Sequence, residues 1–140
     1  MRSYFDSSAF VKLLKDEAGS DEAIDLWEGS VAVITSRLTY VETRSALASA
    51  VRGGGLSPDG YGVARTELER LWRSVSPVAL TRAAAVLAGD VSERTGLRSG
   101  DAVQLATALQ AADPDLVFVC WDRALSRAAA AVGFPVVPSG

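Results

Sequence analysis

The sequence predicts an α/β fold, a three-layer α/β/α sandwich with a central parallel sheet. Short stretches that are apolar throughout alternate with longer stretches whose apolar residues recur at helical spacing. Strands of this kind are typical of parallel sheets, which crossover helices cover on both faces. The chain has 140 residues, 49% of them hydrophobic and 22% charged, so we expect a single domain, residues 1–140, with an ordinary core.

Residues 1–55 are predicted to form two strands and three helices. The β-branched run VAVIT is typical of a strand, and Phe10, Leu13 and Leu14 recur at helical spacing before it. Three consecutive glycines, 53–55, end the third helix in a turn rather than a domain linker. The expected elements are a strand at 3–5, helices at 7–15 and 21–28, a strand at 31–35 and a helix at about 38–51.

Residues 56–140 are predicted to add four helices and three strands. Pro58 suits the first turn of a helix, and Gly96 and Gly133 each end one. The stretch LVFV has the fully apolar character of a buried strand. The expected elements are a helix from 58 through TELERLWRSV, a strand at 76–80, helices at 81–94 and 99–112, a strand at 116–119, a helix at 123–132 and a last strand in PVVP.

Composition excludes several kinds of chemistry. The chain has no histidine, which excludes serine–histidine and cysteine–histidine catalysis and histidine-bound zinc. The single cysteine, Cys120, cannot form an internal disulfide and fits a reducing compartment. The net charge of −3 argues against a surface that attracts nucleic acid everywhere, but acidic groups gathered around a divalent cation could still bind a phosphate locally.

The sequence has neither an 18-residue apolar run nor the apolar segment of a signal peptide near Arg2. We therefore expect a protein of the cytoplasm with no contact to a membrane.

Four acidic residues lie where ligands bind in such folds, at the carboxyl ends of strands and the starts of the following helices. Asp6 follows the first strand and Asp122 follows LVFVCW. Glu42 and Asp101 lie near helix starts. If the topology brings these positions together, the result is a cluster of carboxylate oxygens.

Each acid also has a purely local explanation. Asp6 and Asp122 could cap the helices that follow them, and Asp101 could interact with a helix dipole in the first turn. Glu42 has the spacing of a capping box with Thr39.

Considered together, the acids favour a metal site over four separate caps. Asp101 lies four residues before Leu105 and so borders a buried helix face, and Glu42 shares a face with Leu38. A desolvated carboxylate without a partner costs several kcal/mol. Oxygen ligands without histidine select Mg²⁺ or Mn²⁺ over zinc.

These residues resemble a PIN domain, and in particular the toxin ribonucleases of VapBC toxin–antitoxin pairs. The similarity covers essentially the whole chain. It rests on four stretches in order: YFDSSAFVKLL, SRLTYVETRSALA, GLRSGDAVQLATAL and VFVCWDRALSRAAAAVGF.

The resemblance implies an acidic pocket at the carboxyl edge of the sheet and hydrolysis of RNA with Mg²⁺ or Mn²⁺. It also implies a cognate VapB-type antitoxin as partner and a homodimer. The metal ligands and catalytic residues would be Asp6, Glu42, Asp101 and Asp122, supported by Ser7 or Ser8, which would also cap the first helix. Cys120 departs from the Thr or Ser of many relatives, and a thiol is a poorer hydrogen-bond partner than a hydroxyl, so weaker support is expected at that corner.

Several basic residues are candidate contacts for RNA phosphates because they lie within a turn or two of the acids. Solvated side chains on the backs of helices are the alternative for each. The candidates are Lys12, Lys15, Arg44, Arg98 and Arg123.

Two other functions remain open from the sequence. A PIN-like module could bind a protein partner without catalysis, but the loss of an acid would be expected then, and all four are present. A metal-independent hydrolase could use Ser8 activated by Lys12, although serine–lysine hydrolases usually show Ser-x-x-Lys spacing.

Overall fold

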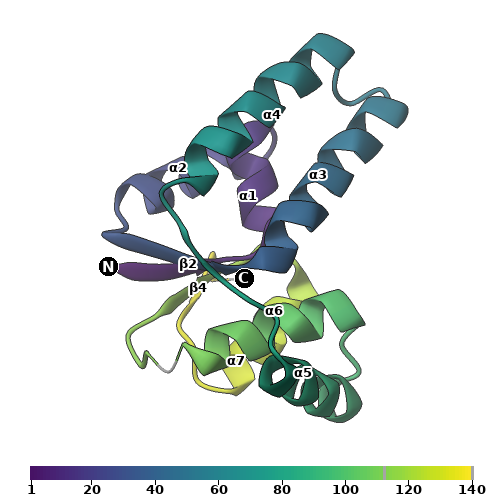
Figure 1. The fold of residues 1–140 in the computed structure, drawn as a ribbon. Helices are drawn as coiled ribbons and strands as arrows, with labels where there is room; N and C mark the ends of the chain where they lie inside the picture. Colours follow the sequence, from purple (N-terminus) through teal and green to yellow (C-terminus); the bar gives the residue numbers. More distant parts are fainter. Residues whose placement is uncertain (112, 140) are drawn as a thin grey trace.

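The computed structural model describes residues 1–111 and 113–139, and its centre is a five-stranded parallel sheet between two layers of helices (Figure 1). The strand order is β3-β2-β1-β4-β5. The elements are β1 (Arg2–Phe5), α1 (Ser7–Leu14), α2 (Ser20–Glu28), β2 (Ala32–Ser36), α3 (Arg37–Arg52), α4 (Pro58–Trp72), β3 (Ser76–Val78), α5 (Arg82–Thr95), α6 (Ser99–Gln110), β4 (Val117–Val119), α7 (Arg123–Ala131) and β5 (Val136–Val137).

The two faces of the sheet pack against different helices. Side chains alternate along each strand, so Tyr4 joins the cluster formed with α5–α7, and its neighbour Phe5 joins the cluster formed with α1–α4. Figure 1 shows the same division, with α1–α4 on one side of the sheet and α5–α7 on the other. The expected three-layer sandwich is therefore confirmed.

The central strand, β1, places Asp6 beside the carboxyl end of β4. β1 pairs with β2 on one side and β4 on the other, with Phe5 opposite Val119. The backbone N–H of Asp6 donates to the Val119 carbonyl oxygen at 3.3 Å. The carboxyl ends of β1 and β4, and the helices that start there, therefore meet at one edge of the sheet.

The predicted elements are all present, with ends shifted by a few residues. Pro58 is the first residue of α4 and Gly96 ends α5 in the left-handed region at φ 72°, both as expected, and Ser57 is the N-cap of α4. The helix expected at 99–112 ends at Gln110, and residue 112 lies outside the described residues. Among the described helices, none combines the length and apolar character needed to cross a lipid bilayer.

Candidate active site

The four predicted acids lie at helix starts along the carboxyl edge of the sheet. Asp6 is the N-cap of α1, and Asp122 is the N-cap of α7. Asp101 lies in the first turn of α6, and Glu42 lies in the second turn of α3. Asp6 is buried, Glu42 and Asp101 are half-buried, and Asp122 is exposed.

Two of the local explanations turn out differently from the expectation. Asp6 itself caps α1, because its Oδ1 accepts from the Ala9 N–H at 3.0 Å, so the cap is neither Ser7 nor Ser8. The capping box of Thr39 and Glu42 is wrong: Ser36 is the N-cap of α3, and Thr39 lies inside the helix. Glu42 is thus free of any capping role, since its carboxylate is one turn too far along the helix.

Asp6 is the most deeply buried of the four, with 2% of its surface exposed. Ser8 Oγ donates to its Oδ1 at 2.6 Å, and the Cys120 thiol donates to its Oδ2 at 3.1 Å. Burial is the main reason that the pKa of Asp6 rises from 3.8 to about 6, while the hydrogen bonds from Ser8, Ala9 and Cys120 oppose the rise. The carboxylate is therefore held in place but pays a desolvation cost when it is ionised.

Cys120 takes part in the site despite being a thiol. Its Sγ lies 3.1 Å from Asp6 Oδ2 and 3.5 Å from the backbone oxygen of Asp122, so it links two of the acids. Burial, followed by the charge of Asp6, raises the pKa of the Cys120 thiol far above its ordinary value. The thiol therefore stays a neutral hydrogen-bond donor at neutral pH. The Asp6 carboxylate is supported by Cys120 even though a thiol replaces the Thr or Ser of many relatives.

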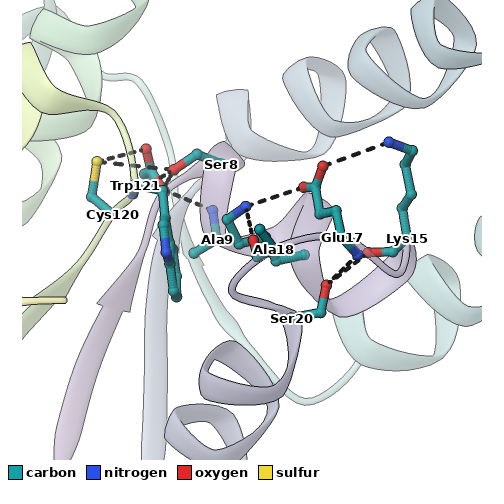
Figure 2. Close-up of polar contacts among 10 residues, drawn as sticks. Ser8, Ala9, Lys15, Glu17, Ala18, Ser20, Cys120 and Trp121 are labelled. Carbon is teal, nitrogen blue, oxygen red and sulfur yellow. Dashed lines mark hydrogen bonds and ion pairs between the residues drawn. The ribbon is translucent and has the colours of Figure 1, made fainter. Parts of the chain in front are cut away.

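Ser8 connects Asp6 to the chain that carries Asp122. Its hydroxyl donates to Asp6 and accepts from the Trp121 N–H at 3.0 Å. Figure 2 shows Ser8 beside Trp121 and Cys120. One hydroxyl therefore ties the start of α1 to the loop between β4 and α7.

Replacing Ser8 with alanine should lower the free energy of unfolding by about 1–3 kcal/mol, because a partly buried N–H and a buried carboxylate each lose a partner. The pKa of Asp6 should rise further, since the Ser8 hydrogen bond lowers it. Urea unfolding of Ser8→Ala beside Ser7→Ala tests this. Ser7 is the matched control because its hydroxyl makes no hydrogen bond among the described residues. Equal stability of the two variants would contradict the role of Ser8.

The four carboxylates interact with one another but do not form a ready-made metal cage. In residues 1–111 and 113–139, no three Asp, Glu or Cys side chains stand close enough to hold one metal ion. Burial, then the charges of Asp122 and Glu42, raise the pKa of Asp101, and Arg98 opposes this. The charge of Asp101 also adds to the burial effect on Asp6. All four groups therefore lie within electrostatic range of a neighbouring acid.

The donor set fits a hard divalent cation. All four groups offer carboxylate oxygens, the ligands that Mg²⁺ and Mn²⁺ prefer. None of the four has a lysine or arginine within ion-pair distance in the described part of the chain; its ion pairs involve other acids. A cation would therefore neutralise charge that the protein itself leaves unpaired, provided that it draws the side chains together.

The five predicted phosphate contacts have different surroundings. Lys12 donates to the Ala18 carbonyl oxygen at 2.7 Å and lies over the Trp121 ring at 5.4 Å, and Lys15 lies 3.5 Å from Glu17. Figure 2 shows the Lys15–Glu17 pair within the turn that follows α1. Both lysines therefore already have polar partners in the turn after α1.

The arginines differ from the lysines. Arg44 lies over the Tyr40 ring at 5.7 Å. Arg98 lines a cavity of about 620 Å³ together with Asp101 and Asp122, and Arg123 lines a second cavity of similar size beside Cys120.

Sequence reasoning gave no role to two further residues of this region. Arg127 lines both cavities, and its position four residues after Arg123 on α7 was the available signal. Gln104 donates from Nε2 to Glu42 Oε1 at 2.7 Å. Only its place three residues after Asp101 could have pointed to it.

A family model of the PIN domain matches residues 3–131. The match extends from the strand before Asp6 to the end of the helix that Asp122 caps. The chain therefore belongs to the PIN domain family.

Within that family, the similar curated proteins are VapC proteins. Ribonuclease VapC45 and Ribonuclease VapC49 of Mycobacterium tuberculosis are each 45% identical to this chain over 136 residues, which is 97% of this chain and 94% of each relative. The crystal structure of VapC20 from the same species, a toxin that cleaves the sarcin–ricin loop, has a TM-score of 0.70 at 20% identity over 96% of both chains. That likeness supports the fold.

Proposed function

We propose that this chain is an endoribonuclease toxin of a type II toxin–antitoxin pair that hydrolyses RNA phosphodiester bonds with Mg²⁺ or Mn²⁺. Its two relatives at 45% identity are named ribonucleases, which supports the reaction class. The observation that carries the metal dependence is the set of interacting carboxylates, none of which forms an ion pair with a lysine or arginine in the described residues.

The chain's own residues would divide the work at this edge of the sheet. Asp6 and Asp101 would hold the cation, with Glu42 and Asp122 binding it directly or through water. When bound, a divalent cation supplies the charge that polarises a phosphodiester and promotes ionisation of an attacking water. Ser8 and Cys120 hold the buried Asp6 carboxylate in place, so it loses little conformational freedom when it binds.

The cavity beside Asp101 and Asp122 would take the RNA strand. It presents two carboxylates together with Arg98 and Arg127, so it could bind a phosphate next to the one that is cleaved. Arg123 in the second cavity would extend this contact along α7. In the cell, we expect a VapB-type antitoxin to inhibit the enzyme, and we expect the chain to form a homodimer.

The serine–lysine alternative lacks its essential contact. The Ser8 hydroxyl is hydrogen-bonded to Asp6 and to the Trp121 N–H. The Lys12 amine is hydrogen-bonded to Ala18 and Glu17. No hydrogen bond joins Ser8 to Lys12 among the described residues.

Metal dependence is tested by measuring RNA cleavage and thermal unfolding with and without divalent cations. EDTA should abolish cleavage, and Mg²⁺ or Mn²⁺ should restore it. Mg²⁺ at about 100 times its dissociation constant should raise the free energy of unfolding by about 2.7 kcal/mol. Cleavage that survives EDTA would favour the serine–lysine hydrolase. Binding of the protein encoded by a neighbouring small gene, without any cleavage, would favour the non-catalytic module.

A further inference from the structure

Gln104 is a polar side chain buried in the core, with 1% of its surface exposed. Its Nε2 donates to Glu42 Oε1 at 2.7 Å and to Thr39 Oγ1 at 3.0 Å. Its Oε1 accepts from the Tyr4 hydroxyl at 2.6 Å. The carboxamide thus joins β1, α3 and α6, and every one of its contacts is between residues far apart in the sequence.

Tyr4 determines which way the carboxamide faces. The Tyr4 ring is fully buried and stacks on Phe118 with centroids 5.1 Å apart, so the position of its hydroxyl is fixed. A tyrosine hydroxyl keeps its proton at neutral pH, and that of Tyr4 donates to Gln104 Oε1. A flipped amide would place Oε1 against Glu42 Oε1, two acceptors in contact.

A hydrogen-bonded chain supports the same arrangement from the other side. Thr39 Oγ1 lies 2.7 Å from the Thr35 hydroxyl, which donates to the Phe5 carbonyl oxygen at 2.7 Å. Phe5 is the residue before Asp6. The contacts of Gln104 therefore extend from Glu42 back to the backbone that carries Asp6.

Gly100 makes room for the second oxygen of Glu42. A Cβ on Gly100 would lie 2.7 Å from Glu42 Oε2, closer than a Cβ and a non-bonded oxygen approach in proteins. Gly100 is four residues before Gln104, so both lie on one face of α6. Glu42 is held between them, beside Asp101.

We propose that Gln104, oriented by Tyr4, is a positioning residue that holds the Glu42 carboxylate beside Asp101. The inference rests on the proposed metal-dependent cleavage. It adds that α6 both carries one acid and positions another.

Three substitutions test the arrangement in different ways. Tyr4→Phe keeps the stacked ring and removes the proton that orients Gln104. Gln104→Met keeps a similar volume and removes the donor to Glu42. Gly100→Ala removes no polar group and suits a helix, but its methyl group displaces the flexible Glu42 carboxylate. Leu109→Ala, on the same helix and outside the polar contacts, is the control for lost stability.

Mn²⁺ binding measured by electron paramagnetic resonance, together with kcat and KM for RNA cleavage, gives the readouts. In the three variants, the Mn²⁺ dissociation constant should rise or kcat should fall by about 10–100-fold, with KM for RNA within about threefold of the wild type. Gly100→Ala should weaken Mn²⁺ binding or lower kcat without lowering the melting temperature. Leu109→Ala should lower the melting temperature and keep Mn²⁺ affinity and kcat.

Wild-type Mn²⁺ affinity and kcat in Tyr4→Phe and Gly100→Ala would overturn the positioning role. The positioning role would also be overturned if the losses of Mn²⁺ affinity and kcat were proportional to the loss of melting temperature in all variants, Leu109→Ala included. If the wild type neither binds Mn²⁺ nor cleaves RNA, the proposed function fails and the positioning role fails with it. That outcome is recognised from the wild type alone.

Discussion

Replacing Asp6 with asparagine should abolish RNA cleavage while leaving the fold intact. The loss should exceed about 100-fold, because changes in residues that merely support a metal ligand already cost 10–100-fold. Asparagine is as good an N-cap as aspartate, and its oxygen can accept the hydrogen bonds of Ser8 and Ala9. The variant therefore removes the charge with little change in shape.

Initial rates of RNA cleavage, with circular dichroism to verify folding, test this. Asp115→Asn is the matched control: Asp115 is exposed and precedes β4, so it lies at the opposite edge of the parallel sheet. A folded Asp6→Asn protein that cleaves RNA at the rate of Asp115→Asn would refute the assignment of Asp6.

Stability without metal should fall as the pH rises from about 4 to about 6. The pKa of Asp6 is about 6 in the folded protein and 3.8 as its ordinary value, so the folded state holds this proton more tightly than the unfolded chain. Below pH 4 the group is protonated in both states, and above pH 6 it is ionised in both. The free energy of unfolding lost through Asp6 across this interval is about 3 kcal/mol. The raised pKa of Asp101 lowers stability in the same direction.

The comparison with Asp6→Asn isolates this effect from the other titrating groups. In EDTA, the variant should match the wild type at pH 4 and exceed its free energy of unfolding by up to about 3 kcal/mol at pH 7. Urea unfolding at each pH gives the two curves. Saturating Mg²⁺ should narrow the difference at pH 7, since the cation neutralises the ionised carboxylate of the wild type only. A constant difference at all pH values would contradict the raised pKa.

The local patterns predicted the fold and the positions of the acids. Apolar strands such as LVFV and the helical stripe around Leu105 depend on residues within a few positions of one another, which is why their periods can be recognised in the sequence. Because parallel strands end at one edge, placing Asp6 and Asp122 after two strands also predicted that they would lie near each other.

Spacing alone was misleading where a local and a distant partner compete for the same group. The Thr39–Glu42 spacing matches a capping box, yet Ser36 begins the helix and Glu42 binds Gln104. Asp6 has both roles at once, since one oxygen caps α1 and the other accepts from the Cys120 thiol. Whether an acid caps a helix or serves a site depends on what packs against it.

The sequence by itself determined an α/β protein of the PIN domain family with acids at strand ends, because these features depend on neighbours in the chain and on the types of residue present. Only the tertiary structure decided how those acids are held. Tyr4 and Gln104 are 100 positions apart, and Asp6 and Cys120 are 114 apart. No periodicity encodes such contacts, since they exist only once β1 has paired with β4 and packed against α6.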